Sequence, residues 1–166
     1  EADTALPQPQ PDALQRLAGA HRARSRAAVA AITGSNGKTS TKEFLAAALT
    51  PLGRVLRTAG NLNNHIGLPL TLLSLESSHD AAVVEIGLNH PGELGMLSRL
   101  AAPRVAVITS IAPAHLEGLG SVAGVARAKS EILDGLVPDG VLVLPAGVPE
   151  LDAAVARYRG RRVAFG

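Results

Sequence analysis

Six short apolar runs recur along the chain, each of the length of one buried strand. They are Ala27 to Ile32, Val55-Leu56, Ala81 to Ile86, Val105 to Ile108, Val141 to Leu144 and Arg162 to Phe165. Segments with helical spacing lie between them, at about Lys38 to Leu49, Leu68 to Leu75, Gly92 to Leu100, Val122 to Leu136 and Glu150 to Tyr158. This alternation predicts a three-layer α/β fold, with a mostly parallel sheet of about six strands and helices on both faces. Ligands of such sheets bind beyond the carboxyl ends of the strands.

The beginning of the chain has a different character. Residues 1–11 are rich in Pro, Gln and Ala, as linkers are, and a helix with apolar residues on one face is expected to follow from Asp12. We therefore expect residues 1–27 to form a leader with one helix and residues 28–166 to form one domain. Because Met96 is the only methionine, we also expect the chain to be a piece of a longer protein.

Composition narrows the class of protein. Hydrophobic residues make up 46% of the chain and aromatic residues only 2%, so Ala, Val, Leu and Ile must build the core. There is no cysteine for a disulfide, and no apolar run reaches the roughly 18 residues of a membrane-spanning helix. The net charge is only +2, and the basic residues are scattered. These features predict a soluble, cytoplasmic protein with no membrane insertion and no nucleic acid partner.

Arginine greatly outnumbers lysine among the basic residues. Of the 16 lysines and arginines only three are lysines, namely Lys38, Lys42 and Lys129. This chain uses arginine wherever a generic positive charge is enough. Each of the three lysines is therefore a candidate for a chemical role that arginine cannot fill.

The first strand runs into a loop with the residues of a phosphate site, as in P-loop NTPases. They are Gly34, Ser35, Asn36, Gly37, Lys38, Thr39 and Ser40. Glycines let backbone N–H groups approach phosphate oxygens, Lys38 can reach the β- and γ-phosphates, and the Thr39 hydroxyl can bind Mg²⁺. The general pattern has a glycine where Ile32 stands, so the loop is a shortened one. The alternative is a Gly-rich helix start that binds nothing.

An acidic residue lies near the carboxyl end of the third apolar run. Glu85 follows Ala81 to Val84, and a buried carboxylate is costly unless it is paired or bound to a metal. Its oxygens suit Mg²⁺, so we expect Glu85 to be a magnesium ligand beside Thr39. The alternative is an ordinary acid at the end of a strand.

Four stretches, in this order and spacing, resemble the Mur ligase family, and within it the branch that adds D-alanyl-D-alanine. They are residues 33–40, 60–73, 84–93 and 114–118 continuing to 128–132. The resemblance implies the central ATP-binding domain of an ATP-dependent amide ligase, with amino- and carboxyl-terminal flanking domains absent here. It implies ATP and Mg²⁺ as cofactors, and UDP-N-acetylmuramoyl-tripeptide and D-alanyl-D-alanine as substrates. The tripeptide carboxylate would attack the γ-phosphate of ATP to give an acyl phosphate and ADP. The amine of D-alanyl-D-alanine would then displace phosphate from the acyl phosphate to form the amide.

The resemblance also implies roles for individual residues. Lys38, Lys129 and His115 would be catalytic, with His115 at a second magnesium site and a carbamate on Lys129 that acts as a metal-binding anion. The tripeptide side of the cleft would be lined by Thr58, Asn61, Asn64, Asn89 and His90. One departure concerns adenosine, since Pro145-Ala146-Gly147 stands where the family has an Asn and an Asp. Two alternatives stay open, namely an amide ligase of the folylpolyglutamate or cyanophycin type and a nucleotide-binding module without catalysis.

Overall fold

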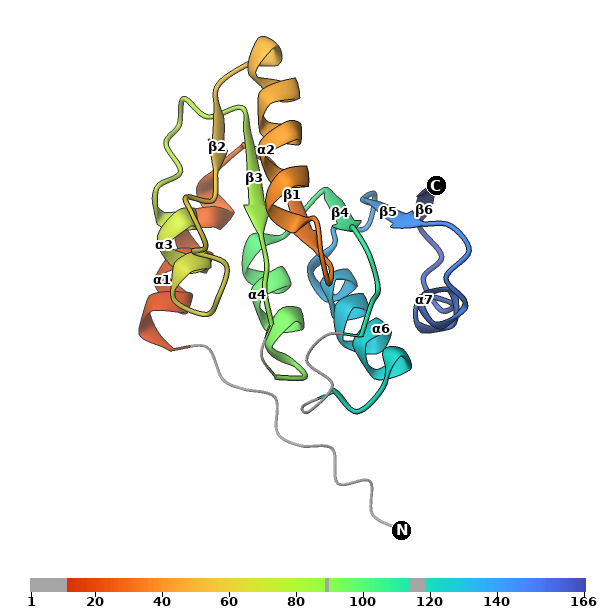
Figure 1. Ribbon diagram of the computed structural model, residues 1–166. Coiled ribbons are helices and arrows are strands. Elements are labelled where there is room, and N and C mark those ends of the chain that lie inside the picture. Colours follow the sequence, from red (N-terminus) through yellow and green to blue (C-terminus); the bar gives the residue numbers. More distant parts are fainter. Residues whose placement is uncertain (1–11, 89, 114–118) are drawn as a thin grey trace.

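The computed structural model describes residues 12–88, 90–113 and 119–166. Its six strands form one sheet in the order β2-β3-β1-β4-β5-β6, which Figure 1 follows from one side to the other. Every neighbouring pair is parallel. The strands are β1 (Ala28–Thr33), β2 (Val55–Arg57), β3 (Ala81–Glu85), β4 (Val105–Ile108), β5 (Val141–Pro145) and β6 (Arg161–Phe165). The predicted six-stranded parallel sheet is confirmed.

The helices connect the strands as the spacing predicts. They are α1 (Ala13–Arg24), α2 (Lys38–Leu49), α3 (Gly67–Leu73), α4 (Glu93–Ala101), α6 (Val122–Ser130) and α7 (Pro149–Ala154), with short 3-10 turns at Thr50–Leu52 and Glu131–Gly135. The stretch predicted as one helix over 122–136 is therefore α6 followed by a 3-10 turn. None of the helices in the described part of the chain is both long and apolar enough to cross a bilayer.

The last helix ends earlier than its sequence predicts. α7 stops at Ala154 rather than at Tyr158. The carbonyl of Val155 accepts hydrogen bonds from the Tyr158 N–H and, at 2.6 Å, from the Arg162 guanidinium. The Tyr158 hydroxyl donates to the Gly140 carbonyl at 3.0 Å. Contacts that Tyr158 and Arg162 make outside the helix thus accompany the turn after α7, and helix propensity alone does not reveal such contacts.

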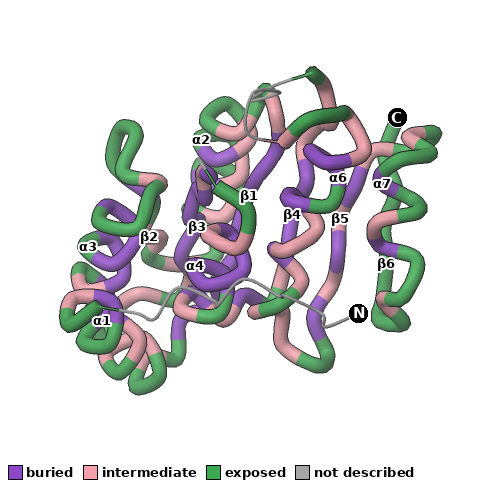
Figure 2. The backbone as a smooth tube through the Cα atoms, turned by 90° about the horizontal axis from the view of Figure 1, so that it is seen from below, coloured by how far each residue is buried: buried purple, intermediate pink, exposed green. Residues whose placement is uncertain are grey.

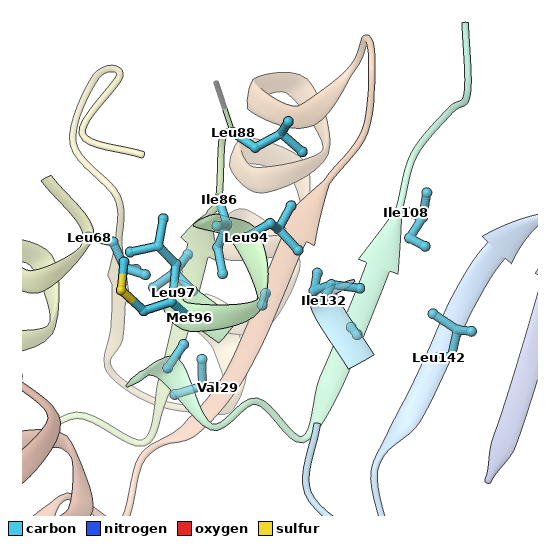
Figure 3. Close-up of a cluster of buried hydrophobic side chains, with 14 of the residues drawn as sticks. Val29, Leu68, Ile86, Leu88, Leu94, Met96, Leu97, Ile108, Ile132 and Leu142 are labelled. Carbon is cyan, nitrogen blue, oxygen red and sulfur yellow. The ribbon is translucent and has the colours of Figure 1, made fainter. Parts of the chain in front are cut away.

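The core consists of two apolar clusters, because successive strand residues point to opposite faces of the sheet. The larger cluster joins the strands to α3, α4, α6 and α7, and Figure 3 shows its branched side chains around Ile86 and Leu97. On the opposite face a smaller cluster of Ile32, Val83 and Val107 lies under Ala46 of α2. Helices on both faces thus make the three layers that the sequence predicts.

Burial is greatest in the middle of the sheet. Strands β1, β3 and β4 are almost entirely buried, whereas all five residues of β6 are exposed, as Figure 2 shows. The chain passes from β1 to β2 and β3 on one side and then crosses to β4 on the other. The carboxyl end of β1 is therefore a point where the winding direction reverses, the usual place of a ligand in such sheets.

The amino-terminal helix packs on the other helices rather than standing apart. Asp12 and Gln15 form a capping box at its start. The Gln15 amide then donates to the His65 carbonyl at 3.2 Å, and the Arg22 guanidinium donates to the Ala101 carbonyl at 2.9 Å. Hydrogen bonds to backbone carbonyls thus connect α1 to the segment before α3 and to the end of α4.

Candidate functional site

The loop between β1 and α2 has a backbone that requires glycine at two points. Gly34 has φ +147°, and a Cβ placed there would lie 1.9 Å from the Thr109 hydroxyl oxygen. Gly37 has φ +80° and is the N-cap of α2. An L side chain rarely adopts such backbone angles, so both glycines let the loop turn tightly into the helix. The backbone N–H groups at the start of α2 consequently lie at the carboxyl edge of the sheet.

A second loop, which follows β4, holds the first one in place. The Ser35 N–H donates to the Ser110 carbonyl at 3.0 Å, and the Ser35 hydroxyl donates to the Ala112 carbonyl at 3.1 Å. The Thr109 hydroxyl donates to the Asn36 carbonyl at 2.6 Å. Thr109 and Ser110 were not singled out from the sequence, although two hydroxyl residues directly after a buried strand are a usable signal. The hydroxyl of Ser35 is thus engaged within the protein.

The lysine of the loop lies over the loop itself. The Lys38 ammonium donates to the Gly34 carbonyl at 2.8 Å and is 3.4 Å from the Ser35 carbonyl. The side chain is half-buried, and Ser40 follows on the exposed side of α2. A compact cation beside free backbone N–H groups makes this end of α2 electropositive, which favours an anion.

Glu85 lies at the centre of a polar network beside this loop. It is 2% exposed, and its carboxylate accepts from the Thr39 hydroxyl at 2.9 Å and from the Asn63 amide at 2.8 Å. Its own backbone N–H donates to the Thr58 hydroxyl at 3.0 Å. Thr39 and Glu85 come together because β3 lies next to β1, with Ile32 opposite Glu85 in the register. Two oxygen donors of the type that Mg²⁺ prefers are therefore in contact.

The residues expected on the tripeptide side lie in different surroundings. Thr58 is fully buried behind Glu85 rather than on the surface of the cleft. Asn61 and Asn64 are exposed, and the Asn64 side chain accepts from the Gly67 N–H at 2.8 Å at the start of α3. His90 is exposed before α4. Asn89 lies outside the described residues.

Lys129 of α6 is 2% exposed. Burial, and to a smaller extent the positive charge of Lys38, together lower the pKa of its ammonium to about 8. An amine with this pKa is partly neutral near physiological pH, which an exposed lysine is not. His115 lies outside the described residues. Within the described residues, no three His, Cys, Asp or Glu side chains gather as a metal cluster.

An open groove of about 540 Å³ continues from the loop across the face of β4, β5 and β6 that α2 leaves uncovered. Asn36, Gly37 and Thr41 line one end, and Val107, Val143 and Phe165 supply apolar side chains. Phe165 is 44% exposed. The groove thus offers an apolar surface directly beside the loop.

Both the sequence and the fold of this chain are similar to those of known proteins. The family model of the Mur ligase middle domain matches residues 32–166, which is most of the chain. The chain belongs to the Mur ligase family. This Mur ligase domain is 50% identical over 134 residues to the UDP-N-acetylmuramoyl-tripeptide--D-alanyl-D-alanine ligase of Escherichia coli (strain K12), over 81% of this chain and 30% of the relative.

Solved structures resemble the Mur ligase domain over nearly its whole length. A crystal structure of MurF from Acinetobacter baumannii superposes with a TM-score of 0.85 at 40% identity, covering 92% of this chain and 34% of that one. The crystal structure of MurF ligase from Thermotoga maritima in complex with ADP gives 0.86 at 32% identity, covering 100% of this chain and 39% of that one. The chain thus spans between about 30% and 40% of the length of these relatives.

Proposed function

We propose that this chain is the nucleotide- and magnesium-binding domain of a cytoplasmic, ATP-dependent ligase. The ligase would join D-alanyl-D-alanine to UDP-N-acetylmuramoyl-tripeptide, the reaction for which the 50% identical relative from Escherichia coli is named. We assign the domain to residues 28–166, with residues 1–27 as a leader that carries α1. Further domains of the whole enzyme would supply the rest of the active site.

The observation that carries the proposal is the 2.9 Å contact between Thr39 and Glu85 beside the glycine loop. The N–H groups at the start of α2 and the ammonium of Lys38 would bind the β- and γ-phosphates. The Thr39 hydroxyl and the Glu85 carboxylate would hold Mg²⁺ against these phosphate oxygens. Mg²⁺ takes few protein ligands and keeps several waters, so two side chains are enough.

The burial and lowered pKa of Lys129 support a carbamate on this residue as a second anionic group near the loop. Its buried amine, with a pKa of about 8, has a substantial neutral fraction that can add to CO₂. The resulting carbamate would convert a buried cation that faces Lys38 into an anion, which relieves their repulsion. This carbamate, with His115, would hold a second Mg²⁺ during phosphoryl transfer to the tripeptide carboxylate.

The Asn-rich loop is our candidate for the tripeptide side. Asn61 and Asn64 are exposed in the segment whose neighbour Asn63 contacts Glu85, and amide side chains both donate and accept hydrogen bonds. We assign Asn89 and His90 to the same side of the cleft. Thr58 would act indirectly, because its hydroxyl accepts a hydrogen bond from the backbone N–H of Glu85 and so helps to hold that residue.

The apolar groove beside the loop is our candidate for the nucleoside. The Thermotoga maritima relative was crystallised with ADP, which makes a bound nucleotide reasonable for this domain. Phe165 and Val143 offer contact to a planar base, whereas Pro145-Ala146-Gly147 has no side chain that could donate to it. The base would therefore contribute less affinity than the phosphates.

Binding and ligation measured separately test the proposal. The isolated chain should bind ATP in the presence of Mg²⁺ but form no amide from UDP-N-acetylmuramoyl-tripeptide, D-alanyl-D-alanine and ATP. The complete protein should form it, and should reject folate with L-glutamate. Failure of the chain to bind ATP at millimolar concentration with Mg²⁺ would refute the assignment, and ligation by the isolated chain would refute the need for further domains.

A further inference from the structure

A charged residue occupies a core-facing position of α2. Lys42 is 1% exposed and lies one turn before Ala46, the other fully buried position of this helix. Residues four apart share a helix face, and the face turned to a sheet is normally apolar. A buried ammonium is costly unless its donors are satisfied, so this lysine needs an explanation.

The surroundings of Lys42 provide one acceptor for each of its three donors. The ammonium donates to the Thr58 carbonyl at 2.9 Å and lies 3.4 Å from the Gly60 carbonyl. It also forms an ion pair of 3.1 Å with Glu43. Two of these three acceptors are backbone atoms of the segment 58–60. A tetrahedral ammonium can serve three such acceptors in a small space, which a planar guanidinium cannot.

The same segment continues to the carboxylate that faces the phosphate loop. The Thr58 hydroxyl accepts from the Glu85 N–H at 3.0 Å. Asn63, five residues further along, donates to the Glu85 carboxylate at 2.8 Å, and its carbonyl accepts from the Gly87 N–H at 2.7 Å. α2 is therefore connected to Glu85 in two ways, directly by Thr39 and indirectly by Lys42 through this segment.

We infer that Lys42 is a positioning residue, which fixes segment 58–63 so that Asn63 and Thr58 hold the Glu85 carboxylate in the direction of the magnesium site. This inference rests on the proposed function, since it gives Lys42 its effect through a Glu85-bound Mg²⁺. Without Lys42 the Asn63 contact would loosen, and the carboxylate would turn away from Thr39 for part of the time.

The test compares Lys42→Met and Lys42→Gln with the unchanged 166-residue chain. We expect the Mg²⁺ concentration that half-saturates ATP binding to rise about five- to tenfold, while ADP affinity without Mg²⁺ stays within twofold. Amide hydrogen exchange should accelerate in segment 58–64 and stay unchanged in β1 and β4. Glu43→Gln is the control, because it keeps both carbonyl contacts of Lys42, and its Mg²⁺ requirement should stay within twofold.

A double variant decides whether Lys42 acts through Glu85. In a Glu85→Gln background, Lys42→Met should add no further rise in the Mg²⁺ requirement. Three results would overturn the inference. They are a further rise of the Mg²⁺ requirement in the double variant, an unchanged Mg²⁺ requirement in the single Lys42 variants, and loss of cooperative unfolding in both single variants. Failure of the proposed function has a different signature, since the unchanged chain would then show no Mg²⁺-dependent ATP binding at all.

Discussion

The hydroxyl of Thr39 and the carboxylate of Glu85 lie 2.9 Å apart although 46 positions separate them in the sequence. The parallel pairing of β1 and β3 makes this contact, because it brings the loop after one strand to the acid that ends the other. We propose that this hydroxyl at the start of α2 and this carboxylate at the end of β3 together bind Mg²⁺ beside the phosphate loop.

Replacing the carboxylate should change the need for metal more than the affinity for nucleotide. In Glu85→Gln we expect the half-saturating Mg²⁺ concentration for ATP binding to rise at least tenfold, because an amide oxygen is a weaker magnesium ligand than a carboxylate. ADP affinity without Mg²⁺ should hold or improve, since a negative charge is lost near the phosphates. Calorimetric titrations over a series of Mg²⁺ concentrations measure both, with exposed Glu150→Gln as control. An unchanged Mg²⁺ requirement would show that Glu85 is not a ligand.

The glycine at position 34 should be irreplaceable for steric reasons. Gly34→Ala places a Cβ 1.9 Å from the Thr109 oxygen, so the loop must move away from the segment that holds it. We expect ATP affinity to fall at least tenfold. Gly147→Ala is the matched control, because Gly147 has φ +69° and no atom within 4 Å of an added Cβ. Equal losses of ATP affinity in the two variants would contradict this explanation.

The amine of Lys129 should react with CO₂ in a pH-dependent way. With a pKa of about 8, roughly a tenth of the amine is neutral at pH 7 and roughly half at pH 8. At constant dissolved CO₂, the ¹³C carbamate signal should therefore rise several-fold over this interval. Lys129→Arg should lack the signal, and a signal of the same size in that variant would place the carbamate elsewhere.

The same pKa predicts the pH dependence of stability. The folded chain holds Lys129 neutral between about pH 8 and its ordinary value of 10.5, while the unfolded chain binds the proton. The free energy of unfolding therefore rises with pH over that window. Below about pH 8 the folded chain bears the full cost of burying the charged Lys129 ammonium. In CO₂-free buffer, urea midpoints should rise from pH 8 to pH 10 in the unchanged chain and rise less in Lys129→Met. Parallel pH curves would argue against the lowered pKa.

The larger apolar cluster should dominate the stability of the domain. Leu97 is fully buried among α4 and the sheet (Figure 3), and Leu97→Ala should lower the free energy of unfolding by about 2–5 kcal/mol. Leu17, 60% exposed on α1, is the matched leucine, and its replacement by Ala should cost no more than about 0.5 kcal/mol. Urea unfolding followed by circular dichroism measures both. Similar losses of unfolding free energy in the two variants would mean that the core lies elsewhere than around Leu97.

The strands could be predicted closely because β1, β3 and β4 are buried on both faces and read as continuous apolar runs. The helix start at Lys38 could be predicted from the glycine before it. The end of α7 could not, because Arg162 and Tyr158 set it through contacts outside the helix.

The site could be predicted in part. Glu85 was singled out because an acid at the end of an apolar run is costly, and it lies beside Thr39 as expected. The sequence did not show that Asn63 and Thr58 surround it, since they come from a loop 22 and 27 positions away. Lys42 was noticed only as one of three lysines, and its partners became visible only with the fold.

Titration of the chain with ATP in an isothermal calorimeter, with and without Mg²⁺, tests the central claim most directly. We predict binding to one site that strengthens with Mg²⁺. In Lys38→Ala the affinity should fall by roughly 10- to 100-fold, since a charge-assisted hydrogen bond contributes about 1.5–3 kcal/mol and a tenfold change is about 1.4 kcal/mol. Arg127→Ala, which removes an exposed cation of α6, is the control and should bind ATP normally. Equal ATP affinity in the unchanged chain and in Lys38→Ala would contradict the account.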